Sequence, residues 1–190
     1  MIRVTILSIC ILLSSFSYGQ SSSEKIKIKD SIVGFLNWFK KNGNSIEKRP
    51  IVTGFNATNI KGDSVVKVNM SAVDEYLANL KKSNYVSDLF LVPIKIRYKE
   101  VSDALLKSPL IDYFGPIGGL ESDPIFGFEP AQILDHINEG RFTKIYILYD
   151  KAIVKFDIPK LNQSIFTLTK IDEIWLIDYF GADRTNFDRK

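Results

Sequence analysis

The sequence ends in four apolar runs, which are FTKIYILYD at 142–150, AIVKFDI at 152–158, SIFTLTKI at 164–171 and EIWLIDYF at 173–180. Each run is rich in β-branched and aromatic residues, which favour strands. Only a few polar residues separate each run from the next, and connections of that length suit hairpins. The four runs therefore predict an antiparallel β-meander.

The last run predicts a strand with two apolar faces. One face carries Trp175, Ile177 and Tyr179, and the other carries Ile174, Leu176, Asp178 and Phe180. We expect helices to cover one face of such a sheet, because a sheet with an apolar face must bury it against another layer. A loop or a partner subunit is expected against part of the opposite face, the back of the sheet.

Helical and turn patterns fill the chain before the meander. The predicted elements are a helix from Ile28 to Gly43, a hairpin over 50–70 with a turn at Gly62-Asp63, a helix over 71–82 with a capping box at Ser71–Asp74, a helix over 93–107 opened by Pro93, and a short helix over 130–138. Between the last two, residues 109–130 hold four prolines and four glycines and predict a long irregular loop.

Length and charge restrict the class of protein. The chain has 190 residues, 25 basic and 22 acidic side chains and a net charge of +3, which fits one domain. Both signs are spread along the sequence, so the basic footprint that nucleic acid requires is missing from it. Helices followed by a meander predict an α+β fold, with helices packed in the concave face of a curved antiparallel sheet.

The first residues are typical of a secretory signal. Arg3 precedes an apolar run over 4–13, and Ser17 and Gly19 have the spacing of a signal-peptidase site. We expect a signal peptide at 1–19, a polar lead-in at 20–27, a single domain at 28–181 and a loose tail at 182–190. The chain would then be exported to the periplasm or beyond, without a transmembrane span, because ten apolar residues are too few to cross a bilayer. The alternative is a lipid anchor at Cys10.

Cleavage after Gly19 would remove Cys10, the one cysteine of the chain. Disulfides, thiol nucleophiles and thiolate metal sites are then excluded. His136 is the single histidine, with Asp135 and Glu139 beside it, which is a weak metal signal. We therefore expect neither a metal nor a cofactor. A short Asp-Ser-Val pattern at 63–65 makes Ser64 a candidate for glycosylation.

Several strings together resemble one known family. These are IVGFLNWFKKN, KVNM, EYLANLKKSNYVS, ESDPIF and IDEIWLIDYF, over residues 28–181. They resemble exported bacterial proteins that carry an uncharacterised domain of the nuclear-transport-factor-2-like superfamily, whose members have a cystatin-like cone. The resemblance implies that fold and no established enzymatic activity. The loop departs from the family's commoner form, because residues 126–129 are Phe-Gly-Phe-Glu where the family has an amide and an acid.

Polar side chains of the long loop are the candidate site. They are Asp112, Tyr113, Glu121, Asp123 and Glu129. Some members of the superfamily use paired carboxylates in an apolar cone for acid–base chemistry, with a tyrosine aimed at the oxyanion, for which Tyr113 is the candidate here. Asp123 precedes Pro124, and we expect its carboxylate to accept backbone N–H bonds and to fix the loop at the mouth of the cone.

These observations predict an exported, non-enzymatic domain that binds a small ligand or an envelope protein through the cone mouth or the back of the sheet. A homodimer through the sheet back is one form of that hypothesis. The alternative function is a small-molecule hydrolase, isomerase or dehydratase that uses the loop carboxylates. An enzyme requires convergent acids in a closed pocket, whereas a binding module requires an exposed apolar surface.

Overall fold

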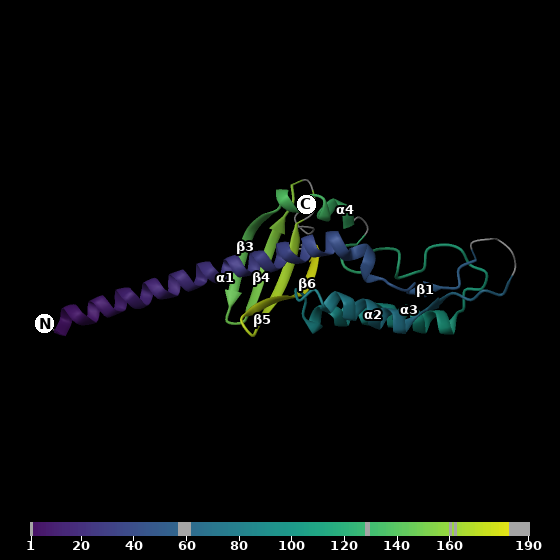
Figure 1. The fold of residues 1–190 in the computed structure, drawn as a ribbon, viewed down its shortest axis with the longest axis horizontal. Helices are drawn as coiled ribbons and strands as arrows, with labels where there is room; N and C mark the ends of the chain where they lie inside the picture. The colour runs from purple at the N-terminus through teal and green to yellow at the C-terminus, as the bar shows by residue number, and fades with distance from the viewer. Residues whose placement is uncertain (1, 57–61, 128–129, 160, 162, 183–190) are drawn as a thin grey trace, which may run out of the picture.

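The four C-terminal runs form one antiparallel sheet, which confirms the predicted meander (Figure 1). Its strands, in spatial order, are β3 (Arg141–Leu148), β4 (Lys151–Asp157), β5 (Ser164–Ile171) and β6 (Ile174–Ala182). The structure is a computed structural model that describes residues 2–56, 62–127, 130–159, 161 and 163–182, with side chains from residue 22 onward. Within these residues the protein has an α+β fold.

A β-bulge in β6 changes the predicted faces of its last residues. Leu168 pairs with Ile177 and Thr167 pairs with Tyr179, so Asp178 is an extra residue between the two pairs. Such an insertion moves every later side chain to the opposite face. Trp175 and Ile177, before the bulge, are buried. After the bulge, Tyr179 is 50% exposed and Phe180 packs against the core. The prediction that Tyr179 shares the face of Trp175 is therefore wrong.

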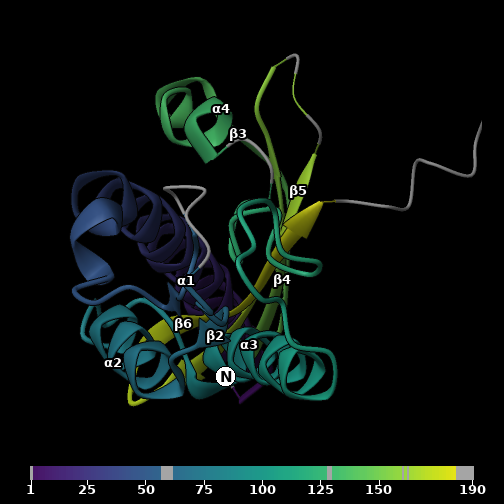
Figure 2. The same cartoon turned by 90° about the vertical axis from the view of Figure 1, so that its right-hand side faces the viewer.

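Three helices pack around this sheet, one across its face and two beyond the edge formed by β6 (Figures 1 and 2). They are α1 (Ile2–Ile46), α2 (Met70–Lys81) and α3 (Asp88–Lys107). α1 crosses the sheet and its N-terminal half projects beyond it (Figure 1). The main core forms between helices and sheet, and its largest fully buried side chains are Phe35, Phe156, Phe166 and Trp175. Burial of one such aromatic side chain contributes a few kcal/mol, so this layer accounts for much of the stability.

Helix boundaries differ from the predicted ones at three places. α1 passes through Gly43 to Ile46, and at its other end it includes the residues predicted as a polar lead-in. The cap of α2 is Asn69, whose side chain accepts a 3.2 Å bond from the N–H of Ala72, and not the Ser71 box. α3 begins at Asp88 and contains Pro93 in its interior, so the prediction that proline opens this helix is wrong.

The early start of α3 has a cause outside the helix. Val86 forms a parallel bridge with Ile177 of β6, and the N–H of Ser87 donates to the carbonyl of Ile177 at 2.9 Å. This pairing extends the sheet edge by a short segment that passes directly into α3. Sheet pairing therefore fixes where the helix begins and outweighs the local effect of Pro93, which costs one backbone hydrogen bond.

The predicted hairpin is present but short. β1 (Val52–Thr53) pairs with β2 (Lys67–Val68), and residues 57–61, just before the predicted turn at Gly62-Asp63, lie outside the described residues. A second apolar cluster lies beside the hairpin, and it consists of Val66, Val101, Leu105 and Ile117. This cluster fastens the hairpin to the C-terminal end of α3.

The short helix predicted over 130–138 is present as two pieces. These are α4 (Pro130–Leu134) and the 3₁₀ turn η1 (Ile137–Glu139). Leu134 and Ile137 are buried, so each piece contributes one anchor to the core. Among the described helices none combines the length and the apolar character needed to cross a membrane. Of the predicted tail, Ala182 ends β6 and the remaining residues lie outside the described part.

Candidate functional site

The predicted loop of residues 109–130 divides into two parts that contact different elements. The first part includes Asp112 and Tyr113 and hydrogen-bonds to the hairpin region through Asn56 and Ser64. The second part, from Gly119 to Gly127, contacts α3 through Arg97 and α1 through Phe126. The candidate residues of the loop are therefore not gathered in one site.

Asp112 and Tyr113 hold local backbone in place. The Asp112 carboxylate accepts bonds of 3.1 and 3.2 Å from the N–H and hydroxyl of Ser64, with Asn56 and the N–H of Gly62 as further donors. Burial raises the pKa of Asp112, but these hydrogen bonds outweigh burial and hold the pKa below its ordinary value. The Tyr113 hydroxyl donates to the carbonyl of Pro116 at 2.8 Å.

The expected role of Asp123 as a turn builder is confirmed. One carboxylate oxygen accepts the N–H groups of Ile125 at 2.8 Å and Phe126 at 2.7 Å. The backbones of Asp123 and Gly127 also bond to each other in both directions, at 2.9 and 3.1 Å. Gly127 has φ +83°, a conformation that glycine adopts without strain. The carboxylate thus closes a rigid five-residue loop that we call the Asp123 loop (residues 123–127).

This loop presents Phe126 to the core. The Phe126 ring lies 4.9 Å from Phe39 of α1 and 5.2 Å from Phe180 of β6, measured between ring centroids. Phe180 continues the contact to Phe166 at 4.7 Å. Phe126 is therefore the link between helix, loop and sheet, and its tilted ring contacts are of the favourable kind.

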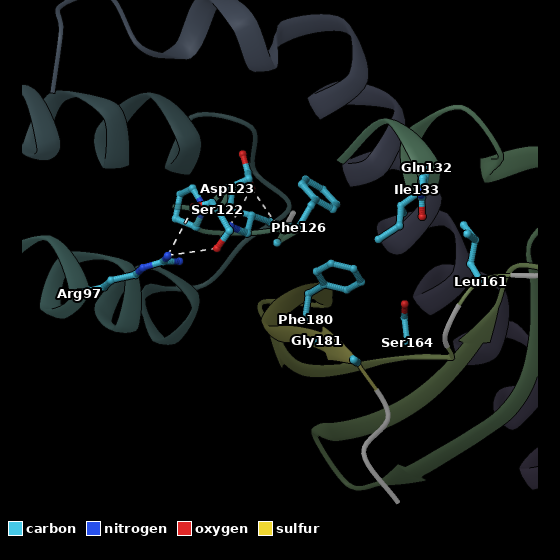
Figure 3. A pocket seen from close by; sticks show the side chains of 14 residues that line it. Arg97, Ser122, Asp123, Phe126, Gln132, Ile133, Leu161, Ser164, Phe180 and Gly181 are labelled. Atoms are coloured by element: carbon cyan, nitrogen blue, oxygen red, sulfur yellow. Dashed lines mark hydrogen bonds between the residues drawn. The ribbon is translucent and has the colours of Figure 1, made fainter. Parts of the chain in front are cut away.

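Arg97 of α3 fixes the approach to the Asp123 loop. Its guanidinium donates to the backbone carbonyl and hydroxyl of Ser122 at 3.4 and 3.2 Å (Figure 3). It also donates to the carbonyl of Gly119 at 2.5 Å. Three acceptors on one planar group restrict the loop far more than a single bond does. Both ends of the segment before the Asp123 loop are thereby held.

A cleft of about 590 Å³ opens on one side of the Asp123 loop. Figure 3 shows Phe126 from the loop, Ile133 from α4 and Phe180 from β6 around it. Leu161 and Ser164 form a further part of the wall. Ser164 is buried, and its hydroxyl lies at the cleft. We call this the apolar cleft, because its walls are mainly aromatic and aliphatic.

A second cleft, of about 640 Å³, opens on the other side of the Asp123 loop. Tyr76 of α2, Tyr98 of α3, Glu47 and Asp123 line it together with Phe39. Both tyrosines are more than nine-tenths buried. Burial, reinforced by the carboxylates of Asp123 and Glu47, raises the pKa of Tyr98 to about 12 and that of Tyr76 higher still, so both phenols stay protonated. We call this the tyrosine cleft.

The sequence did not identify the tyrosine cleft. Tyr76 and Tyr98 stand at helical spacing among the apolar residues of α2 and α3, a pattern that predicts core residues. That prediction is correct for the rings, which are buried. The pattern of apolar residues does not indicate, however, which cleft the hydroxyl at the end of each ring reaches. Glu47 follows the helix end and gave no motif. A tyrosine on a stripe that is otherwise aliphatic is the one hint that the sequence contains.

Of the remaining candidate residues, Asp135 lines the tyrosine cleft, whereas Glu121 and His136 line neither cleft. Glu121 is exposed, and Glu129 lies outside the described residues. His136 is exposed and 4.0 Å from Glu139, while Asp135 pairs with Lys40 at 2.8 Å. In the described parts of the chain, no three acidic, histidine or cysteine side chains gather as metal ligands would. The Ser64 hydroxyl is engaged with Asp112.

Comparison of this chain with protein-family models, with curated proteins and with solved structures found no match in any of the three. The α+β fold and the two clefts beside the Asp123 loop are thus the features of this protein that bear on its function.

Proposed function

We propose that this protein is an exported, non-enzymatic binding domain with the cystatin-like cone of the nuclear-transport-factor-2-like superfamily. In this proposal a small, mainly apolar ligand occupies the apolar cleft. The order of elements supports the fold assignment. One long helix comes first in the sequence, a hairpin and further helices follow, and a four-stranded meander comes last. The long helix lies across the meander (Figure 1). The finer family assignment rests on the resemblance of the sequence strings.

The observation that carries the proposal is the composition of the apolar cleft. A volume of about 590 Å³ lies within the range of small-molecule sites. Phe126, Ile133, Leu161 and Phe180 supply apolar wall. Polar side chains that also line the cleft can fix the orientation of a ligand, and these are Arg97, Ser122, Asp123, Gln132 and Ser164. A few polar groups in a mainly apolar cleft are what such sites share.

The chemistry of Asp123 favours binding over catalysis. Its carboxylate is the one acid among the described lining residues of the apolar cleft, and one of its oxygens already accepts two backbone N–H bonds. Asp112 and Glu121 line neither cleft. The alternative, a hydrolase, isomerase or dehydratase built on loop carboxylates, requires acids that converge on the ligand. It is therefore the less well supported proposal.

Export belongs to the same proposal. Arg3, the apolar run and the Ser17–Gly19 spacing support cleavage after Gly19 and a periplasmic or extracellular location, with lipid anchoring at Cys10 as the alternative. An envelope protein or a second copy of the chain is the proposed macromolecular partner. The back of the sheet supports a partner because Tyr146, Ile153 and Tyr179 are each at least 50% exposed there.

Titration with Nile red, a neutral apolar dye, tests the proposed ligand site. We expect saturable binding by the full chain, and weaker binding by the variants Ile133→Glu and Leu161→Glu, since a charge on either half-buried wall residue opposes an apolar occupant. The matched control is Leu106→Glu on α3, where the wild-type side chain is 77% exposed. Equal binding by all four proteins, or binding lost in Tyr146→Glu instead, would remove the apolar cleft from the proposal.

A further inference from the structure

The tyrosine cleft contains two phenol groups that have no hydrogen-bond partner among the described residues. The side chains of Tyr76 and Tyr98 are 6% and 7% exposed, and neither hydroxyl hydrogen-bonds to any described residue. Among the described residues, every fully buried polar side-chain atom is hydrogen-bonded. These two hydroxyl oxygens must therefore reach the open space of the cleft that both residues line, while their rings stay in the core.

The carboxylates of the same cleft have acceptor capacity left. Glu47 uses one oxygen to accept the N–H of Ile51 at 3.0 Å, and Asp123 uses one oxygen for the Asp123 loop. In the described structure the second oxygen of each carboxylate accepts no hydrogen bond. Asp123 is half-buried, so its free oxygen favours a ligand that brings donors, and the exposed Glu47 adds a second free oxygen and a negative charge.

The charge balance of the cleft is negative. Lys40 is the one cation among its described lining residues, and it is paired with Asp135. Arg97 acts on Tyr98 from outside the cleft, and its guanidinium is committed to Gly119 and Ser122. Glu47 and Asp123 are thus left without a cation, and the cleft attracts positive ligands and repels anions.

We propose that the tyrosine cleft binds a small organic ammonium ion. An ammonium group has three donors, and the free oxygens of Glu47 and Asp123 and a phenol oxygen of Tyr76 or Tyr98 supply three acceptors. The ring of Phe39 and the side chain of Leu134 contact the apolar body of the ligand. A bare metal ion fits less well, because hard cations take six or more oxygen ligands. This site does not depend on whether the apolar cleft binds anything.

Three probes of one shape and different charge test the assignment. Benzylammonium, benzyl alcohol and benzoate are titrated into the full chain at neutral pH in a calorimeter. We expect benzylammonium to bind about tenfold or more tightly than benzyl alcohol, and benzoate to give no heat of binding. Equal affinity for the three probes, or tighter binding of benzoate, would overturn the proposal. Nile red binding in the apolar cleft is measured separately, so either site can fail alone.

Two conservative variants locate the site. The double variant Tyr76→Phe, Tyr98→Phe removes both hydroxyls, and Glu47→Gln removes one charge while keeping an acceptor for the N–H of Ile51. Each should weaken benzylammonium binding about fivefold or more. The matched controls are Tyr179→Phe on the back of the sheet and Glu121→Gln on the exposed loop, which should keep wild-type affinity. Unchanged urea midpoints establish that the variants fold. Wild-type affinity in both site variants would place the ammonium elsewhere and refute the assignment.

Discussion

The indole Nε1 of Trp175 donates a 2.7 Å hydrogen bond to Oε2 of Glu24, which joins the start of β6 to α1 across 151 positions of sequence. Lys170 of β5 approaches the same carboxylate at 3.2 Å. Glu24 belongs to the segment predicted as a polar lead-in, and in the structure this segment is the part of α1 that meets the β5–β6 turn. A mature chain that begins at Gln20 would keep this contact near its new helix start, where an acid is favourable.

Glu24→Gln should destabilise the protein by about 1 kcal/mol at neutral pH, because it removes a charge that Trp175, Lys27 and Lys170 contact. Burial raises the pKa of Glu24, but those three contacts outweigh it and lower the pKa below the ordinary 4.5. A carboxylate with a lowered folded-state pKa contributes stability above its unfolded pKa and loses it as pH falls through the folded value. Urea denaturation at several pH values measures both effects.

The difference between wild type and Glu24→Gln should therefore begin to shrink near pH 4.5 and disappear as pH falls through the lower folded-state pKa of Glu24. The control is Glu121→Gln, an exposed acid that should show no difference at either pH. A constant gap between wild type and Glu24→Gln down to acid pH would mean that the charge of Glu24 is not what Trp175 and Lys170 stabilise.

Phe35→Ala and Trp175→Ala should each cost about 3–5 kcal/mol of unfolding free energy. Phe35 is 0% and Trp175 is 2% exposed, so truncation of either side chain leaves a large cavity in the main core. Tyr179→Ala, on the exposed side of the same strand, should cost about 1 kcal/mol or less. Chemical denaturation distinguishes these values readily, and a loss under about 1 kcal/mol for Phe35 or Trp175 would contradict the core assignment.

The sequence predicted the four strands, but it did not predict the β-bulge that interrupts the alternation of side chains in β6. The four runs are strands because their β-branched and aromatic content is local information. The bulge at Asp178 is not local, since its carboxylate accepts bonds from Ser87 at 2.5 Å and from Thr169, one of which lies 91 positions away. Those partners hold Asp178 out of the alternation, and the face of Tyr179 changes as a consequence.

The candidate site likewise has local features, which the sequence predicts, and features that depend on contacts between distant segments, which it does not predict. Asp123 could be assigned a turn role, because an Asp before Pro favours a side chain that bonds to the following backbone. The clefts depend instead on how α2, α3 and α1 are placed around the Asp123 loop, which core packing decides. Tyr76, Tyr98 and Glu47 come from three separate segments and meet at the tyrosine cleft only in the folded chain.

Asp123→Asn should keep the free energy of unfolding within about 1 kcal/mol of wild type, because the amide oxygen can accept the N–H groups of Ile125 and Phe126. Asp123→Ala leaves both donors without that acceptor and should cost about 1–3 kcal/mol. Urea denaturation of the two variants measures the difference. Equal losses in both would mean that the charge, and not the loop geometry, is what Asp123 contributes.

The mature protein should begin at Gln20, since Ser17 and Gly19 satisfy the small-residue requirement of signal peptidase. Intact-mass measurement on protein purified from the cell envelope tests this directly. The control is Gly19→Leu, which should block processing and retain the signal mass. A diacylglycerol-modified Cys10 at the N-terminus would replace soluble export with lipid anchoring.

The back of the sheet should mediate a homodimer. Tyr146, Ile153, Thr167 and Tyr179 pair in one row across β3, β4, β5 and β6, and Tyr146, Ile153 and Tyr179 have exposures of 60%, 50% and 50%. An exposed apolar row on a sheet is typical of an interaction surface. Analytical ultracentrifugation should detect a dimer that the double variant Tyr146→Lys, Tyr179→Lys converts to a monomer, because like charges would then face each other across the interface.

Crosslinking distinguishes this dimer from other assemblies. In a Cys10→Ser background the chain has no cysteine, so Ile153→Cys introduces a single thiol at the centre of the row. Sheets packed face to face stand about 10 Å apart, and a disulfide needs Cα atoms about 4.4–6.8 Å apart. A short bismaleimide, rather than direct oxidation, should therefore join two Ile153→Cys copies. Leu106→Cys on α3 is the exposed control, and equal crosslinking of the two variants would show that the contact is not specific to the sheet back.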